Sequence, residues 1–155
     1  VDLFHKGAAD LFITAEPWIT QLEEAGGKRV FDSTEIPGRI VDVMVVRANA
    51  IEPYRDALHT LVAAHFKALT FIREHPTEAA QLMAPRLQIS PEQMTQAMNG
   101  LIQPDAATSK AMLLPSSPLT EQITALQSLM LRNGLISTRP QAATVFEPRF
   151  HPATN

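Results

Sequence analysis

The sequence has no cysteine among its 155 residues. Disulfide bonds, thiolate metal sites and cysteine nucleophiles are therefore excluded for this chain. The sequence also has no apolar run approaching the roughly 18 residues that a membrane-spanning helix needs. Both absences are compatible with a globular protein that a bacterium exports.

A strong charge of one sign is absent as well. The 13 Lys and Arg residues are nearly balanced by 16 Asp and Glu residues, which leaves a formal net charge of −3. Such a balance does not attract nucleic acid or an acidic membrane surface. We therefore expect no nucleic-acid partner.

Motifs for cofactor binding and catalysis are missing too. The five histidines are scattered and form no metal-binding pair, and the Gly26-Gly27 pair matches no phosphate-binding fingerprint. Ser33, Ser116 and Ser117 lack the strand–turn–helix elbow of a serine hydrolase. We expect no metal, no cofactor and no catalytic residue, and hence a role other than that of an enzyme.

The composition that remains is that of a globular domain, with 45% apolar and 19% charged residues. Its most informative stretch runs from Gly7 to Trp18. Residues 11–13 form a continuous apolar run, as in a strand covered on both faces. Pro17 follows where a helix begins. The stretch predicts a loop, a buried strand and the start of a helix.

This arrangement predicts a binding crevice. In open α/β sheets, ligands bind at the carboxyl ends of strands, where the loops turn into helices. Thr14, Glu16 and Trp18 occupy that place and are candidate ligand-binding residues. Structural roles are the alternative: Glu16 would stabilise the helix dipole by roughly 0.3–1 kcal/mol, and Trp18 would pack the helix on the sheet.

Two further strands are expected, at 28–33 and at 39–48. The second is rich in β-branched residues, although Asp42 interrupts it. With residues 9–16, these segments predict an α/β fold with short strands at the front, followed mostly by helices.

Four helices are expected in the rest of the chain. The long helix should open at Pro53 and carry an apolar stripe with a period of 3.6 residues. Thr77 is a candidate cap for the next helix, which should close near Pro85. The last two helices should begin after serine caps. The four expected ranges are 53–75, 77–87, 90–101 and 117–134.

Several segments together resemble a known family. They are GAADLFITAEPW, the Gly26-Gly27 turn, VFDS, IPGRIVDVMVVRANAI and LVAAHFKALTFIREHPTEAAQLMA. In this order they resemble the substrate-binding proteins of bacterial nitrate/sulfonate/taurine-type ABC transporters, a family that includes binding proteins for pyrimidine precursors of thiamine. The resemblance extends to about Phe150.

The resemblance implies a two-lobed periplasmic binding fold of the second type, in which hinge closure traps a solute between the lobes. Residues 1–42 would belong to the second lobe and border the cleft. Residues 43–150 would return to complete the first lobe, and residues 151–155 would form a tail. Arg47, just after the expected strand, is a further candidate ligand residue.

A complete member of that family is about twice as long. We therefore expect the chain to be the C-terminal segment of a binding protein, either paired with the missing N-terminal half or self-associated. The resemblance further implies a periplasmic or lipid-anchored location and a partnership with ABC permease subunits.

The function predicted from these observations is capture of a small polar solute for an ABC importer. One alternative is an enzyme on the same scaffold, such as a desulfinase or a pyrimidine synthase, with its catalytic residues in the missing half. A second is a helical interaction domain without a ligand. A carboxylate at Glu16 would repel an anion, which favours a solute with hydrogen-bond donors or positive charge, such as an aminopyrimidine.

Overall fold

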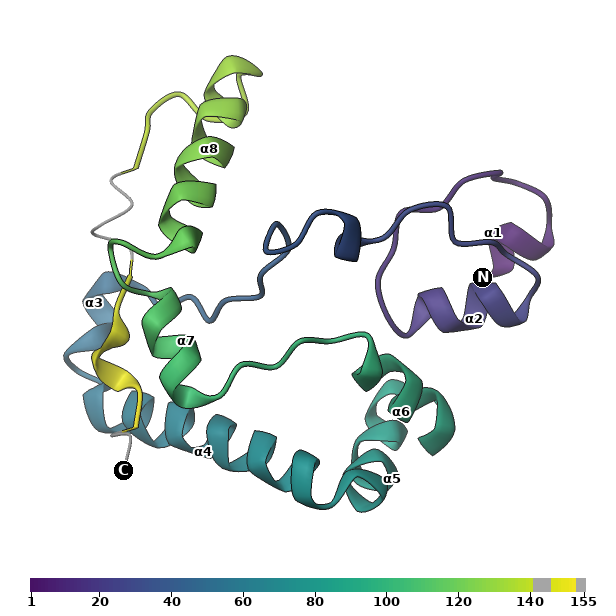
Figure 1. Ribbon diagram of the computed structural model, residues 1–155, viewed down its shortest axis with the longest axis horizontal. Coiled ribbons are helices and arrows are strands. Elements are labelled where there is room, and N and C mark those ends of the chain that lie inside the picture. Colours follow the sequence, from purple (N-terminus) through teal and green to yellow (C-terminus); the bar gives the residue numbers. More distant parts are fainter. Residues whose placement is uncertain (141–145, 153–155) are drawn as a thin grey trace. The chain divides into compact units, whose positions relative to one another are not determined.

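Every regular element in the part of the chain that the structure describes is a helix (Figure 1). The computed structural model describes residues 1–140 and 146–152. The α-helices are α1 (Asp2–His5), α2 (Trp18–Glu24), α3 (Ala48–Ile51), α4 (Arg55–Glu74), α5 (Pro76–Leu87), α6 (Pro91–Asn99), α7 (Ala106–Met112) and α8 (Pro118–Arg132). Two 3-10 helices complete the set, η1 (Ser33–Glu35) and η3 (Pro148–Phe150).

The predicted helix starts that rest on serine caps are confirmed. Ser90 begins α6 with a capping box, in which its Oγ accepts from the backbone N–H of Gln93 at 3.2 Å and the Gln93 side chain accepts from the Ser90 N–H at 3.1 Å. Ser117 caps α8, which ends just before Gly134 with its φ of +67°. Caps satisfy backbone N–H groups that a helix start leaves free, so they act locally.

Other predicted boundaries were wrong. The long helix begins at Arg55, two residues after Pro53. The helix α5 starts at Pro76 without a side-chain cap from Thr77, and it continues through Pro85 to Leu87. Four short elements, α3, α7, η1 and η3, were not predicted, because they lack the sustained apolar period that reveals a longer helix.

The predicted α/β fold class is also wrong, and with it the short front strands of a two-lobed periplasmic binding fold of the second type. None of the three expected strands forms in the described residues. The predicted segments 9–16, 28–33 and 39–48 are mostly irregular, apart from the turn at Glu16, the first residue of η1 and the first residue of α3.

The physical reason is that a strand exists only as part of a ladder. β-branched and aromatic residues fit a pleated, half-buried surface, but that surface needs a neighbouring strand. Most of the large apolar side chains of the expected strands are instead exposed, with Ile13 98% and Val45 84% accessible. The apolar run at 11–13 thus indicated burial that the described residues do not supply.

The helices form two compact units, and the division passes through α4. Unit 1 contains residues 1–32 and 68–103, and unit 2 contains residues 33–67 and 104–155. The predicted boundary between residues 42 and 43 concerned the lobes of a larger protein and stays a prediction. Of the predicted tail 151–155, residues 153–155 lie outside the described residues.

The core of unit 1 is formed by α5 and α6. Ala80 and Ala84 of α5 pack against Met94 and Ala97 of α6, and all four side chains are buried. Met83, Ile89 and Met98 cover this cluster from its edge. Small alanine side chains let the two helix backbones approach closely, while methionine fills the irregular gaps.

The core of unit 2 joins the front of α4 to the C-terminal segment. Phe150 of η3 is buried against Leu58 and Val62 of α4. Arg149 forms an ion pair across the same junction with Glu52, at 3.3 Å, and a second, local one with Glu147, at 2.9 Å. No helix among the described residues is long and apolar enough to cross a membrane.

Candidate functional site

The loop that leads into α2 is fixed by its own glutamate. The backbone N–H groups of Trp18 and Ile19 donate to the carbonyl of Ala15 at 3.0 and 3.3 Å. Oε2 of Glu16 then accepts from the backbone N–H of Thr20 at 3.3 Å and from its hydroxyl at 2.8 Å. Thr20 is buried, so this pair of hydrogen bonds holds the Glu16 carboxylate in one orientation.

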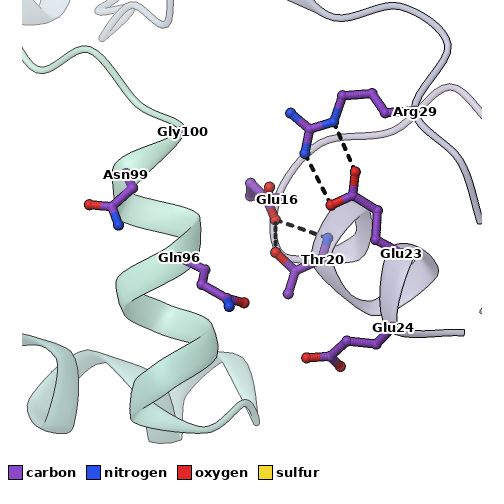
Figure 2. A pocket seen from close by; sticks show the side chains of 8 residues that line it. All are labelled: Glu16, Thr20, Glu23, Glu24, Arg29, Gln96, Asn99 and Gly100. Atoms are coloured by element: carbon purple, nitrogen blue, oxygen red, sulfur yellow. Dashed lines mark hydrogen bonds and ion pairs between the residues drawn. The ribbon is translucent and has the colours of Figure 1, made fainter.

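A hollow of about 440 Å³ lies between this carboxylate and α6, within unit 1. We call it the α2–α6 hollow. Figure 2 shows α2 with its carboxylates on one side and α6 on the other, with the Gln96 side chain extended toward α2. The residues that line it are Glu16, Thr20, Glu23, Glu24, Arg29, Gln96, Asn99 and Gly100.

Two side-chain contacts, each made by hydrogen bonds, lie at the edge of the α2–α6 hollow. Arg29 binds both carboxylate oxygens of Glu23, at 3.0 and 3.2 Å, and the paired geometry raises the pKa of the guanidinium chiefly through these hydrogen bonds. Across the hollow, the side-chain amide of Gln93 donates to Glu24 at 3.0 Å. That bond connects α6 to α2 through residues far apart in the sequence.

Several polar groups in the hollow have no partner among the described residues. Oε1 of Glu16 accepts no hydrogen bond, and the side-chain amides of Gln96 and Asn99 make none. Three carboxylates against one guanidinium give the lining an excess of negative charge. A solute in the hollow would therefore meet carboxylate acceptors and two amides, each of which both donates and accepts.

Glu16 is the predicted site residue that lines the hollow. Thr14 lies in the irregular loop and is exposed, and Trp18 opens α2 with 53% of its surface exposed. Arg47 belongs to unit 2, where it precedes α3 and is exposed. Nothing in the geometry tests a ligand role for these three residues, which stays a prediction.

The sequence did not reveal the rest of the site. In the sequence, the Glu23-Glu24 pair is typical of a solvated helix face. In the structure both residues are exposed, and both also line the hollow. Gln96, Asn99 and Gly100 carry no motif. The capping box at Ser90 was the available signal, since it places the start of α6 and therefore the helix that carries them.

Among the described residues, no group of three or more histidine or acidic side chains is placed to hold a metal ion.

The chain matches a known protein family. The model of the NMT1-like family matches residues 1–88, which is more than half of the sequence. The chain therefore belongs to the NMT1-like family. This is a family of ABC-transporter substrate-binding proteins of the nitrate/sulfonate/taurine class, generally binding proteins rather than enzymes and typically extracytoplasmic.

The match includes α2 and its carboxylates, whereas α6 lies beyond residue 88. No curated protein and no solved structure matches the chain. The predicted family resemblance is thus confirmed for the first 88 residues.

Proposed function

We propose that the chain is a solute-binding component of an ABC importer and that its α2–α6 hollow takes a small solute with hydrogen-bond donors or positive charge. The observation that carries the proposal is the Glu16 carboxylate, which is hydrogen-bonded to Thr20 and lines the same hollow as Gln96 and Asn99, whose side-chain amides form no hydrogen bond among the described residues. Membership of the family supports the binding role.

The charge of the lining argues for this class of solute. Glu16 presents its free oxygen within 4.0 Å of where a Cβ on Gly100 would lie. A carboxylate held in this way attracts a donor or a cation and repels nitrate or a sulfonate. Gln96 and Asn99 add the paired donor and acceptor that side-chain amides offer to a nitrogen heterocycle. An aminopyrimidine has the matching groups.

In this role the chain binds and releases a solute and does not transform it. The protein, either periplasmic or lipid-anchored, then delivers the solute to the permease subunits from the outer side of the cytoplasmic membrane. A permease gene and an ATPase gene beside this one would support the transport role.

Titration calorimetry with an aminopyrimidine, nitrate and an alkylsulfonate tests the proposal. We expect the aminopyrimidine to bind most tightly. Glu16→Gln should weaken that binding by about 1.5–3 kcal/mol, the value of a hydrogen bond to a charged group. Glu74→Gln is the matched control, because Glu74 is an exposed glutamate of unit 1 outside the hollow. Tight sulfonate binding that is unchanged in Glu16→Gln would refute the proposed solute class.

A second pair of variants tests the location. A Cβ at Gly100 would lie 3.5 Å from the Ala97 carbonyl and 3.8 Å from Cγ of Glu16, which is ordinary contact. Gly100→Ala should therefore retain binding, whereas the larger side chain of Gly100→Leu should fill the hollow and abolish it. Equal affinity in both variants would place the solute elsewhere.

A further inference from the structure

The two oxygens of the Glu16 carboxylate are not equivalent. Oε2 accepts two hydrogen bonds, from the Thr20 hydroxyl at 2.8 Å and from the Thr20 backbone N–H at 3.3 Å (Figure 2). A carboxylate oxygen has two lone pairs, so both acceptor positions of Oε2 are filled. Oε1 accepts no hydrogen bond among the described residues, and it lies 4.0 Å from the position of a Cβ on Gly100, the residue that ends α6. Glu16 therefore offers a solute one oxygen rather than two.

The other two carboxylates of the lining are occupied as well. The guanidinium of Arg29 donates to both oxygens of Glu23, at 3.0 and 3.2 Å. Oε2 of Glu24 accepts from the Gln93 amide at 3.0 Å. The Arg29–Glu23 pair illustrates what a planar, forked donor needs, which is two available oxygens on one carboxylate. In the described part of the chain, no carboxylate that lines the hollow keeps both of its oxygens free of hydrogen bonds.

We propose that Thr20 determines the specificity of the α2–α6 hollow: the hollow selects a solute whose donor is a single nitrogen, such as an amine or an exocyclic amino group, over one with a forked guanidinium or amidinium group. The inference rests on the proposed function, because it requires that the solute binds to Glu16. Thr20 acts through Glu16 and is therefore a positioning residue.

The burial of Thr20 gives this selection its force. A forked donor reaches Oε2 only by displacing the Thr20 hydroxyl, and a buried hydroxyl that loses its partner cannot turn to water instead. A single nitrogen that donates to Oε1 leaves both hydrogen bonds of Thr20 intact. The cost of displacement therefore falls on the forked donor alone. Two solutes of equal charge are attracted equally by the carboxylate, so charge does not make this distinction.

Titration calorimetry with benzylamine and benzamidine gives the first test. Both probes have a phenyl ring and one positive charge at neutral pH, but benzylamine donates from one ammonium nitrogen and benzamidine from a fork of two nitrogens. The hollow, at about 440 Å³, is within the usual size range of small-molecule sites. We expect benzylamine to bind the wild-type chain more tightly. Tighter binding of benzamidine would overturn the inference.

Substitution of Thr20 gives the second test. Thr20→Val keeps the branched shape but frees one acceptor position on Oε2. It should raise the affinity for benzamidine relative to benzylamine by about tenfold, the scale of one hydrogen bond to a charged group. Because this ratio is compared between two forms of the chain, the intrinsic difference between the probes cancels.

Two further variants separate the hydroxyl from its surroundings. Thr20→Ser retains the hydroxyl and should keep the wild-type ratio to within about twofold. Thr77→Val is the matched control, because Thr77 is an exposed threonine of unit 1 outside the hollow, and it should leave the ratio unchanged. Circular dichroism should give the same helix content for all three variants.

The outcomes distinguish this inference from the proposed function. An equal loss of both probes in Thr20→Val, or an unchanged ratio, would refute the role of Thr20 and leave the proposed solute class standing. A ratio that changes as much in Thr20→Ser as in Thr20→Val would assign the effect to packing and would also refute that role. If neither probe nor an aminopyrimidine binds the wild-type chain, the proposed function fails and the inference fails with it.

Discussion

The two units of the molecule hold their helices together in different ways. In unit 1 the buried cluster joins α5 and α6, which follow each other in the sequence. In unit 2 the buried cluster joins Leu58 and Val62 of α4 to Phe150, near the other end of the chain. The core of unit 1 thus rests on a local helix pair, and the core of unit 2 depends on the return of the C-terminal segment.

This difference matters because the α2–α6 hollow lies in unit 1 and the core that depends on the C-terminal segment lies in unit 2. Unit 1 contains the α2–α6 hollow, placed by a helix with a complete capping box. Unit 2 exposes the apolar segment 41–47 beside its core. Variants that loosen one unit and leave the other unchanged would sharpen the comparison.

The largest effect is expected from Phe150→Ala. Removing a buried phenylalanine typically costs about 3–5 kcal/mol, and Phe150 is the sole residue that the C-terminal segment contributes to the described cluster. Hydrogen exchange should report lost protection at the front of α4, with α5 and α6 unchanged. Phe31→Ala is the control, because Phe31 is 56% exposed. Equal loss of protection in both units would show that they unfold as one.

A smaller effect, about 1 kcal/mol, is expected from Ser90→Ala, which removes the cap of α6. The loss should lower the free energy of unfolding of unit 1. It should also slightly weaken solute binding, because Gln93 then no longer ties α6 to Glu24 as firmly. Ser116→Ala, at an exposed turn position, is the matched control for urea unfolding and calorimetry. Unchanged stability would show that the capping box is dispensable.

The smallest effect should be a pH dependence confined to unit 2. The His151 ring shares a hydrogen bond of 3.0 Å with the Ser109 hydroxyl and lies 5.5 Å from the ring of Phe66. Its Nδ1 is buried and has no hydrogen-bond partner among the described residues. Burial is the largest cause that lowers its pKa below 6.5, and the nearby charges of Lys110 and His65 lower it further.

The direction in which stability changes with pH follows from the link between proton binding and folding. Because the folded pKa is below the unfolded value, the stabilisation by neutral His151 is fully present above pH 6.5 and is lost as the pH falls through the folded pKa. The protection factors of the amides at the front of α4, which correct for the intrinsic pH dependence of exchange, should therefore fall in acid. His151→Gln should reduce this dependence, whereas His5→Gln, at an exposed histidine, should leave it intact. An identical acid response in both variants would exclude His151 as its source.

Much of the helical structure was predictable from local chemistry. The caps at Ser90 and Ser117, and Gly134 after the end of α8, mark boundaries through interactions within a few residues. The apolar period of the long helix was also sufficient to find α4, although its Leu61 side chain is 54% exposed.

The candidate site was predictable only in part. Glu16 was predicted as a site residue because it follows an expected strand at the point where a helix begins; the strand does not form in the described residues, but Glu16 does line the hollow. Gln96 and Asn99 were not, because nothing local relates α6 to α2. The hydrogen bond from Gln93 to Glu24 joins positions 69 residues apart, and such pairs arise only from packing.

The sequence by itself determined where the longer helices lie, the absence of cysteine chemistry and the family to which residues 1–88 belong. Tertiary structure alone decided whether β-branched segments become strands. Residues 39–48 have the composition of a strand, but a strand requires a neighbour to accept its hydrogen bonds, and none forms in the described chain. Helices close their hydrogen bonds within one segment, whereas strands need a second one, and composition cannot supply that partner.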